Sequence, residues 1–306
     1  MKLLDLHCDT ASRMLYEEEK LYKNNLSIDI EKLKKSNSLA QVFAFFIDIG
    51  EASNPYLEFE KMYNNFIEEI NKNDDIDILI SKNQLEDESK MHAILSIEEG
   101  EVVRNASLKD IYNKGIRIIT LTWNYKNAFG YPNYEFLYKD KGLTNEGIEL
   151  VEKMNELGMI IDVSHMSDAG FYDVLKYSKT PFIASHSNSR FMHNHYRNAT
   201  DDMIKKLSEK GGVIGINFYA KFLGDAKVSR ISDMIKHIEH IKNIGGIDVI
   251  SIGTDYDGID SEVEIKNISE MDKLEYALEK HGFTYDEIEK IFYKNATRVF
   301  NTILKE

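Results

Sequence analysis

Short apolar runs alternate with amphipathic stretches along almost the whole chain. Several of the runs are continuous, which is typical of parallel strands that are buried on both faces. They predict eight strands, at residues 2–7, 40–48, 92–97, 116–122, 159–164, 181–185, 212–217 and 248–253. Between them the apolar residues recur with a helical period, which predicts helices at residues 56–71, 145–157, 168–177, 200–210, 231–243 and 270–281, with one or two closing helices over 284–304.

Eight strands that alternate with helices predict an α/β fold, a (β/α)8 TIM-type barrel with C-terminal closing helices. Such barrels run from about 200 to over 400 residues as one domain, so residues 1–306 are expected to form a single domain. Gly158 and Gly211 stand where helix C-caps are expected. Residues 17–38 are expected to form an exposed insertion, and residues 124–144 a long loop on the face where barrels build their active sites.

Acidic and histidine residues stand at the ends of five of the apolar runs. Because neighbouring strands of a parallel barrel end side by side, we expect these residues to meet at one point. Three histidines and two carboxylates would suit zinc, with iron, cobalt or manganese also compatible. The pattern predicts a metal-dependent hydrolase, whose strand-end residues are His7, Asp9, Glu98, His165, His186 and Asp255.

Each strand-end residue also has a simpler interpretation. Alternate side chains of a strand share a face, so His7 and Asp9 can hold one cation or can make ordinary hydrogen bonds. Glu98 is followed by Glu99 and Glu101, and acids so close together repel one another unless a cation or solvent separates them. Glu98 is favoured over its neighbours because it directly follows the apolar run. Its two oxygens could bridge two cations.

Asp255 follows the eighth strand, which lies beside the first strand in a closed barrel. It is either a sixth ligand or an acid/base, and the alternative is an Asp-rich turn before Gly258. Arg197 has a planar guanidinium that suits a substrate carboxylate, whereas the alternative is an ordinary surface arginine. His193 and His195 lie in the same loop without strand placement, so we rank them below His165 and His186 as ligands.

Composition excludes several classes of partner. The net charge of −14 repels phosphate backbones and argues against nucleic acid. The single cysteine, Cys8, cannot form an internal disulfide, which favours a reducing compartment. The N-terminal residues lack signal-peptide features, and no apolar run approaches the roughly 20 residues that span a bilayer. A cytoplasmic protein without membrane contact is expected.

Seven segments of the chain carry a resemblance to a known family. They lie in family order between residue 3 and about residue 258. With them the chain resembles the membrane dipeptidase (renal dipeptidase) family of zinc metallopeptidases, as a bacterial member without a membrane anchor. The segments are DLHCDT, SIEEGE, GIRIITLTWN, GLTNEGIELVEKMNELGMIIDVSHMS, PFIASHSNSR, YRNATDD and IGTDYDG.

The resemblance implies a (β/α)8 barrel with two zinc ions at its C-terminal face, other divalent metals being acceptable. It makes His7 and Asp9 ligands of one ion. It makes Glu98 the bridge, and it assigns His165 and His186 to the second ion.

The family activity is hydrolysis of dipeptides, often with tolerance of a D-residue at the C-terminal position. The resemblance implies that Arg197 binds the terminal carboxylate and that Asp255 is the acid/base beside the scissile amide. The hypothetical nucleophile is a water or hydroxide that bridges the two metals. A homodimer is compatible with the family, although the sequence does not determine the oligomeric state.

Three departures from the family pattern affect these expectations. The family usually reads Glu-Gly-Gly where this chain has Glu98, Glu99 and Gly100, and the extra acid is expected to face solvent or to perturb the metal pocket. Trp123 and Asn124 stand where mammalian members have a substrate-contacting histidine, so we take them as substrate-binding residues with an altered preference. The secretory signal and lipid-anchor tail of the animal enzymes are also not expected for this protein.

Two rival interpretations remain. One is another two-metal barrel hydrolase, an amidohydrolase that acts on cyclic amides, lactones or deaminase substrates. Such enzymes usually begin with His-x-His and often use a carboxylated lysine, whereas this chain has His7-x-Asp9 and a glutamate. The other is a non-catalytic metal- or peptide-binding barrel, in which the loss of a ligand would be expected.

Overall fold

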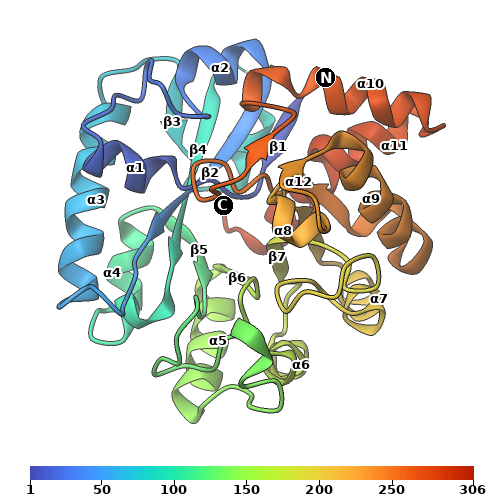
Figure 1. The fold of residues 1–306 in the computed structure, drawn as a ribbon. Helices are drawn as coiled ribbons and strands as arrows, with labels where there is room; N and C mark the ends of the chain where they lie inside the picture. The colour runs from blue at the N-terminus through green and yellow to red at the C-terminus, as the bar shows by residue number, and fades with distance from the viewer. Residues whose placement is uncertain (88) are drawn as a thin grey trace.

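The apolar runs form a closed parallel barrel in the computed structural model, which describes residues 1–87 and 89–306 (Figure 1). The strands follow one another around the barrel, and the pairing of β2 with β4 closes the ring. This confirms the predicted (β/α)8 fold. The eight barrel strands are β1 (Leu3–Asp5), β2 (Ser38–Phe46), β4 (Met91–Glu98), β5 (Ile116–Thr120), β6 (Ile160–Asp162), β7 (Ile183–Ser187), β8 (Val213–Ile216) and β10 (Ile250–Ile252).

Helices surround the barrel, as the view along its axis shows (Figure 1). Side-chain caps begin many of them: Asn54 accepts from Leu57 N, and Thr144 accepts from Gly147 N. Gly158 ends α5 in the left-handed conformation, as the sequence predicts. The helices are α1 (Thr10–Tyr16), α2 (Ile30–Lys35), α3 (Pro55–Ile70), α4 (Leu108–Asn113), α5 (Asn145–Leu157), α6 (Asp168–Tyr177), α7 (Asp201–Glu209), α8 (Ala220–Leu223), α9 (Ile231–Gly245), α10 (Asp272–Lys280), α11 (Tyr285–Glu289) and α12 (Asn295–Ile303).

Short elements account for most differences from the predicted pattern. The strand β3 (Ile76–Ile78) pairs with the start of β4, and β9 (Val228–Ser229) pairs with β11 (Glu262–Val263) outside the barrel. Each of these strands has two or three residues. Alternation over so few positions cannot be recognised in a sequence.

The prediction of an exposed insertion at residues 17–38 is correct only in part, because exposed residues alternate there with fully buried ones. The segment contains α2, and its side chains Leu21, Ile28, Ile30 and Leu33 have no exposed surface. These apolar residues are spaced too irregularly to show one helical stripe. Their burial against the barrel becomes visible only in the folded chain. The loop predicted for residues 124–144 is present, with one short 3-10 turn at Tyr134–Phe136.

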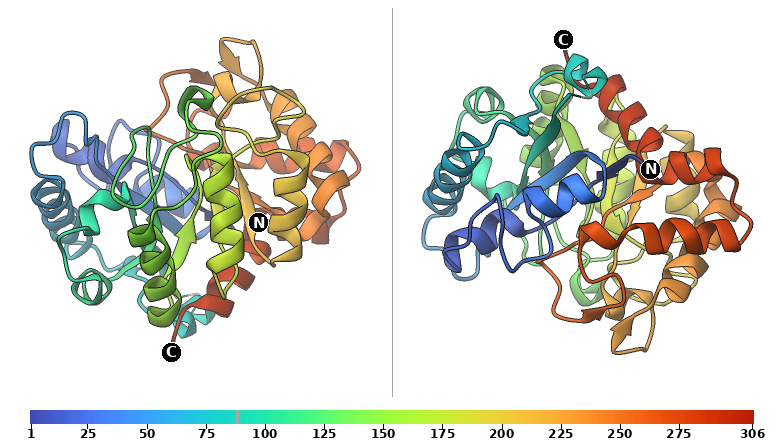
Figure 2. Two further views of the ribbon diagram at one scale, coloured as in Figure 1. Left: turned by 90° about the horizontal axis from the view of Figure 1, so that it is seen from below. Right: turned by 90° about the horizontal axis from the view of Figure 1, so that it is seen from above.

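The two core clusters lie on the two faces of the barrel wall. Outward-facing side chains pack against the surrounding helices, for example Phe45 of β2 against Phe59 and Phe66 of α3. The inward-facing residues form a second cluster with α12. Two further views show α12 near one end of the barrel and the β9–β11 pair near the other (Figure 2). The helix therefore closes one end, and the opposite end is left to the strand-end residues.

Candidate active site

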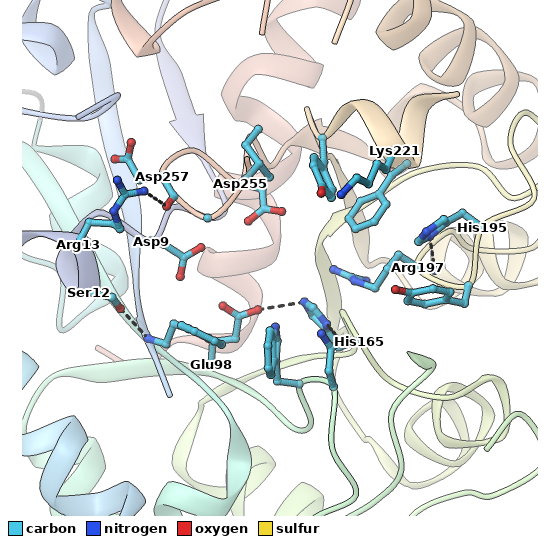
Figure 3. A pocket seen from close by; sticks show the side chains of 18 of the residues that line it. Asp9, Ser12, Arg13, Glu98, His165, His195, Arg197, Lys221, Asp255 and Asp257 are labelled. Atoms are coloured by element: carbon cyan, nitrogen blue, oxygen red, sulfur yellow. Dashed lines mark hydrogen bonds and ion pairs between the residues drawn. The ribbon is translucent and has the colours of Figure 1, made fainter. Parts of the chain in front are cut away.

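The six strand-end residues converge at the C-terminal end of the barrel. Glu98 is the last residue of β4, His186 lies within β7, and Asp9 immediately precedes α1. His165 and Asp255 each lie three residues beyond the end of their strand, β6 and β10. In close-up, Glu98 lies between Asp9 and His165, with Asp255 above them (Figure 3). The structure therefore brings together residues that are up to 248 positions apart in the sequence.

Glu98 is the centre of the cluster. Its Oε2 lies 3.2 Å from His7 Nε2, and its Oε1 lies 3.1 Å from His165 Nε2 and 3.5 Å from His186 Nε2. His7 Nε2 is also 3.5 Å from Asp9 Oδ2. One carboxylate thus presents one oxygen to each of two groups of donors, which is the arrangement that a bridging ligand requires.

The donor atoms fit divalent metal ions. Ligand atoms of His7, Asp9 and Glu98 all lie within 4.8 Å of one another, and so do those of Glu98, His165 and His186. His7 Nε2 and Asp9 Oδ1 are buried and have no hydrogen-bond partner within the described ranges 1–87 and 89–306. Buried polar atoms are seldom left unsatisfied unless an ion or water completes them. Imidazole and carboxylate donors in this number are those that zinc prefers.

Burial and mutual attraction oppose each other in this cluster. Burial raises the pKa of Glu98, but the surrounding histidines, chiefly His7, lower it well below its usual value. Burial lowers the pKa of His7, but Glu98 and Asp9 together raise it well above its usual value. Burial and the neighbouring Glu98 raise the pKa of Asp9 to about 6. The site therefore concentrates negative charge that a cation would stabilise.

The two later histidines are held by their second ring nitrogen. His165 Nδ1 lies 3.1 Å from Asn124 Oδ1, and His186 Nδ1 lies 2.8 Å from the Ser185 hydroxyl. The same hydroxyl donates to Asp162 at 2.5 Å. Outer contacts of this kind fix ring orientation and tautomer in metal sites. The two Nε2 atoms consequently face each other at 3.0 Å.

Asp255 lies beside this cluster in a strained turn. Its φ of 61° is in the left-handed region, and Asn217 donates an amide hydrogen bond of 2.8 Å to its Oδ2. Burial is the main cause that raises its pKa to about 7, helped by the carboxylates of Asp9 and Glu98. Gly258 passes so close that a Cβ there would collide with the Asp9 and Asp255 carboxylates. The turn thus holds the Asp255 carboxyl group against the donor cluster. This carboxyl group can keep a proton near neutral pH.

Arg197 is a buried cation with free donors. It is 3% exposed, and its Nη2 donates to the His186 carbonyl at 3.2 Å. Its Nε and Nη1 have no hydrogen-bond partner in the part of the chain that the structure describes. Burial lowers its pKa, against the attraction of Asp255 and Glu98. Unsatisfied N–H donors of a buried guanidinium are suited to an anion such as a carboxylate.

These groups open into a cavity of about 480 Å³. Trp123 and Asn124 line it, and His195 lines it without belonging to a donor group. His193 is not among the lining residues. The cavity has an acidic side at Asp9 and Glu98 and a basic side at Arg197 and Lys221 (Figure 3). Its other lining residues are Ser12, Arg13, Tyr16, Phe46, His165, Tyr196, Tyr219, Phe222, Asp255, Asp257, Gly258 and Ile259.

Of the two alternatives expected for Glu99, the one in which its carboxyl group faces solvent is wrong. The residue has no exposed surface, and burial raises the pKa of its carboxyl to about 7. Its side chain turns toward the loop after β5, where it accepts a hydrogen bond from Asn127. Three acids within four residues, Glu98, Glu99 and Glu101, suggested a solvated turn. A strained backbone, with φ of 135° at Glu99, instead directs this side chain inward.

Sequence reasoning missed several supporting residues. Asn217 directly follows β8 and therefore stands at a strand end. It was not predicted, because only acidic and histidine residues were considered as candidates. Asp162 and Ser185 lie inside apolar runs, where nothing marks Ser185 as the partner of His186 or Asp162 as the acceptor of the Ser185 hydroxyl. Tyr219 and Phe222 come from the loop and short helix after β8, whose direction the sequence does not reveal.

In a search of the helices of residues 1–87 and 89–306, none proved both long enough and apolar enough to cross a bilayer.

Comparisons with known proteins show similarity in sequence as well as in fold. A family model described as "Membrane dipeptidase (Peptidase family M19)" matches residues 1–305. An uncharacterized dipeptidase of Schizosaccharomyces pombe is 29% identical over 309 residues, covering 91% of this chain and 73% of its own length.

Solved structures show the same architecture. A metallo peptidase from Rhodobacter sphaeroides, liganded with a phosphinate mimic of the dipeptide L-Ala-D-Ala, superposes with a TM-score of 0.91 at 20% identity, covering 99% of both chains. An amidohydrolase from Pseudomonas aeruginosa gives a TM-score of 0.85 at 21% identity, over 99% of this chain and 97% of its own. At these sequence identities the likeness shows a shared fold alone.

Proposed function

The chain belongs to the membrane dipeptidase family, peptidase family M19, and from this membership we propose that it hydrolyses the peptide bond of dipeptides with two divalent metal ions. The observation that carries the proposal is a single one. Five donor residues cluster with Glu98 at their centre, and three of them, Asp9, Glu98 and His165, line one cavity with Arg197, a buried cation whose free N–H groups suit a carboxylate.

The donor groups suggest which residues would hold each ion. His7 and Asp9 would hold one, His165 and His186 the other, and Glu98 would contribute one oxygen to each. Three imidazoles and two carboxylates favour zinc, while manganese, cobalt and iron accept the same donors. When bound, such a pair of ions would activate water and polarise the scissile carbonyl.

Asp255 is proposed as the general acid/base. A carboxyl group whose pKa lies at about 7 can both take and release a proton near neutral pH. Its Oδ2 is held by Asn217, while its Oδ1 lies 3.9 Å from His7 Nε2. It would accept a proton from the attacking water and deliver it to the leaving amine. The Asn217 amide keeps the carboxyl group oriented for both transfers.

Arg197 is proposed to fix the free carboxylate of the substrate. An anion that reaches Nη1 would satisfy a donor of the buried guanidinium that has no hydrogen-bond partner in the described part of the chain. A carboxylate held there places the preceding amide toward the donor cluster across the cavity (Figure 3). A longer segment after the scissile bond would place an uncharged amide at this position, so the contact limits the leaving group to a single C-terminal residue. Trp123 and Asn124 would form the wall beside the substrate side chains.

A D-residue at the second position is included in the proposal. The neighbouring Rhodobacter sphaeroides structure carries a mimic of L-Ala-D-Ala. In this chain we expect acceptance of both L- and D-residues at that position, because an anchor on the carboxylate alone does not select the configuration of the side chain.

A dipeptide library tests the proposal. Protein freed of metal by a chelator should be inactive on Ala-Xaa substrates that carry L- or D-residues at the second position, and zinc should restore turnover. Metal analysis should find close to two ions per chain, and fewer in His186→Ala. Full activity in demonstrably metal-free protein would refute the metal mechanism. Turnover of cyclic amides or lactones in place of dipeptides would favour an amidohydrolase-type reaction.

A further inference from the structure

Glu99 occupies an unusual position directly after the central carboxylate Glu98. Its φ of 135° lies in a region that residues with a Cβ rarely adopt, and its side chain is fully buried. Conformations of this kind persist only where surrounding contacts determine them, and they gather at functional sites. The cavity lining does not include Glu99. A role in the reaction would therefore have to act through other residues.

The Glu99 carboxylate gathers three hydrogen-bond donors. Oε1 accepts from Glu101 N at 2.8 Å and from Asn127 Nδ2 at 2.5 Å, and Oε2 accepts from Trp123 N at 3.3 Å. The Asn127 side chain continues the network, because Nδ2 also donates to the Leu121 carbonyl at 2.8 Å. Both ends of the 121–127 segment are thereby tied to one buried carboxylate.

The tied segment carries one wall of the cavity. The Trp123 ring packs on Phe46 with the ring centroids 4.7 Å apart, and its centroid lies 6.2 Å from that of His165. The next residue, Asn124, places its Oδ1 3.1 Å from His165 Nδ1. That contact directs His165 Nε2 toward Glu98, at 3.1 Å from Oε1. One chain of contacts thus joins Glu99 to the cavity wall and to a donor histidine.

We propose that Glu99 is a positioning residue, which fixes the Trp123–Asn124 wall and through it the substrate position and the ring of His165. The proposal rests on the proposed function, because it assigns a role within the same cavity. It differs from a purely structural role in one respect. Glycine at this position would remove the backbone strain, so the folded protein should tolerate the change while the wall loses its anchor.

Trp123 provides a direct readout, since it is the only tryptophan in the sequence. With excitation at a wavelength that the 17 tyrosines do not absorb, fluorescence and acrylamide quenching therefore report on this wall alone, with or without metal and substrate. In Glu99→Gly we expect severalfold easier quenching and a shifted emission maximum, at unchanged circular dichroism. Glu99→Gln keeps an oxygen for Glu101 and Asn127 but faces Trp123 N–H with an amide N–H, so its quenching should be intermediate.

The kinetic expectation is a loss carried mainly by KM. Measured with excess zinc, kcat/KM of Glu99→Gly should fall about ten- to a hundredfold, the range typical for outer-shell partners of metal sites. Glu99→Gln should recover part of that loss. Glu69→Gln is the matched control, because Glu69 is a buried carboxylate that accepts from Leu21 N but does not line the cavity.

The outcomes separate the two proposals. Quenching and KM in Glu99→Gly that match the Glu69→Gln control would overturn the anchoring role. If Glu99→Gly did not fold, Glu99→Gln and Asn127→Ser would decide the question by the same measurements. A wild-type protein that hydrolyses no dipeptide would refute the proposed function, and Trp123 quenching in the variants would still test whether Glu99 holds the wall.

Discussion

The two ends of the barrel are built on opposite principles. At the N-terminal end, α12 packs Ala296, Val299, Phe300 and Ile303 against the inward-facing residues of the strands, and each of these four side chains is at most 5% exposed. At the C-terminal end the same strands lead to histidines and carboxylates that are also buried, each at most 8% exposed. One end lowers the free energy by removing apolar surface from water. The other end keeps charged groups out of water at a cost.

This difference shows where stability and chemistry lie in the molecule. Burial raises the pKa of Asp9 to about 6 and that of Asp255 to about 7, which means that the fold disfavours their charged forms. His165 and Asp255 also have positive φ values, of 66° and 61°. Backbone strain and desolvation are tolerated at one end because packing at the other end offsets them. Mutations at the two ends should therefore have separable effects.

Asp255→Asn should produce the largest effect, and it should affect catalysis alone. Without the acid/base, kcat should fall about 10²- to 10⁴-fold, the contribution typical of general acid–base catalysis. Stability of the metal-free protein should not fall, because an amide avoids the cost of burying a charged carboxylate. Steady-state kinetics and urea unfolding measure the two quantities. The exposed Asp286→Asn is the control, and near-normal kcat in Asp255→Asn would assign the proton transfer to another group.

Phe300→Ala should produce the converse result. Phe300 has no exposed surface and lies in the cluster inside the barrel, so its truncation should lower the free energy of unfolding by about 3–5 kcal/mol. Because α12 is remote from the cavity lining, kcat/KM per folded molecule should remain within about twofold of wild type. Urea unfolding and active-site titration separate the two. Asn301→Ala, at an exposed position of the same helix, should change neither.

Periodicity and strand placement predicted much of this architecture. All eight barrel strands were located, because strands covered on both faces form continuous apolar runs. The segment 17–38 was misjudged in part, since Leu21, Ile28 and Leu33 acquire their burial from distant elements. The same limit applies to α12, whose place beneath the barrel interior depends on tertiary packing and not on its own helical pattern.

The candidate site was predictable to the extent that it follows from strand ends. His7, Glu98, His186 and Asp255 meet because parallel strands end on one face, and that rule needs no side-chain geometry. The position of Glu99 could not be predicted from strand ends. Its inward direction depends on a positive φ and on donors 24 and 28 residues away. Contacts of this kind leave no periodic signal in a sequence.

Arg197→Ala should have an intermediate effect that depends on the substrate. Loss of a charge-assisted contact worth about 1.5–3 kcal/mol should raise KM for dipeptides about ten- to a hundredfold. C-terminally amidated substrates, which lack the carboxylate, should be affected much less. The comparison of KM on paired free and amidated dipeptides makes the measurement. Equal losses on both would argue against a carboxylate anchor and would leave Arg197 a structural cation at the charged end.

The smallest effect concerns the pH dependence of stability and arises from a buried histidine that belongs neither to the apolar cluster with α12 nor to the donor cluster. His237 of α9 is 1% exposed, and its ring accepts from Ser189 N at 3.0 Å and donates to the Leu223 carbonyl at 3.1 Å. The contact with Ser189 thereby fixes the start of the loop after β7. Burial, helped by the nearby His193 and His240 and opposed by the Leu223 carbonyl and Asp233, lowers the pKa of His237 to about 4.

The sign of the resulting pH dependence follows from that shift. Between about pH 6.5 and pH 4 the unfolded chain binds a proton at His237 that the folded chain refuses, so stability should fall as pH falls through this window. The contribution to the free energy of unfolding is about 2 kcal/mol between pH 6.5 and pH 4.5, given 1.36 kcal/mol for each pKa unit.

Glutamine can accept and donate at similar positions without titrating. Urea unfolding should therefore show a shallower pH dependence in His237→Gln, whereas His281→Gln, at an exposed position, should retain the wild-type slope. An unchanged slope in His237→Gln would mean that the loss of stability in acid arises at the charged end of the barrel instead.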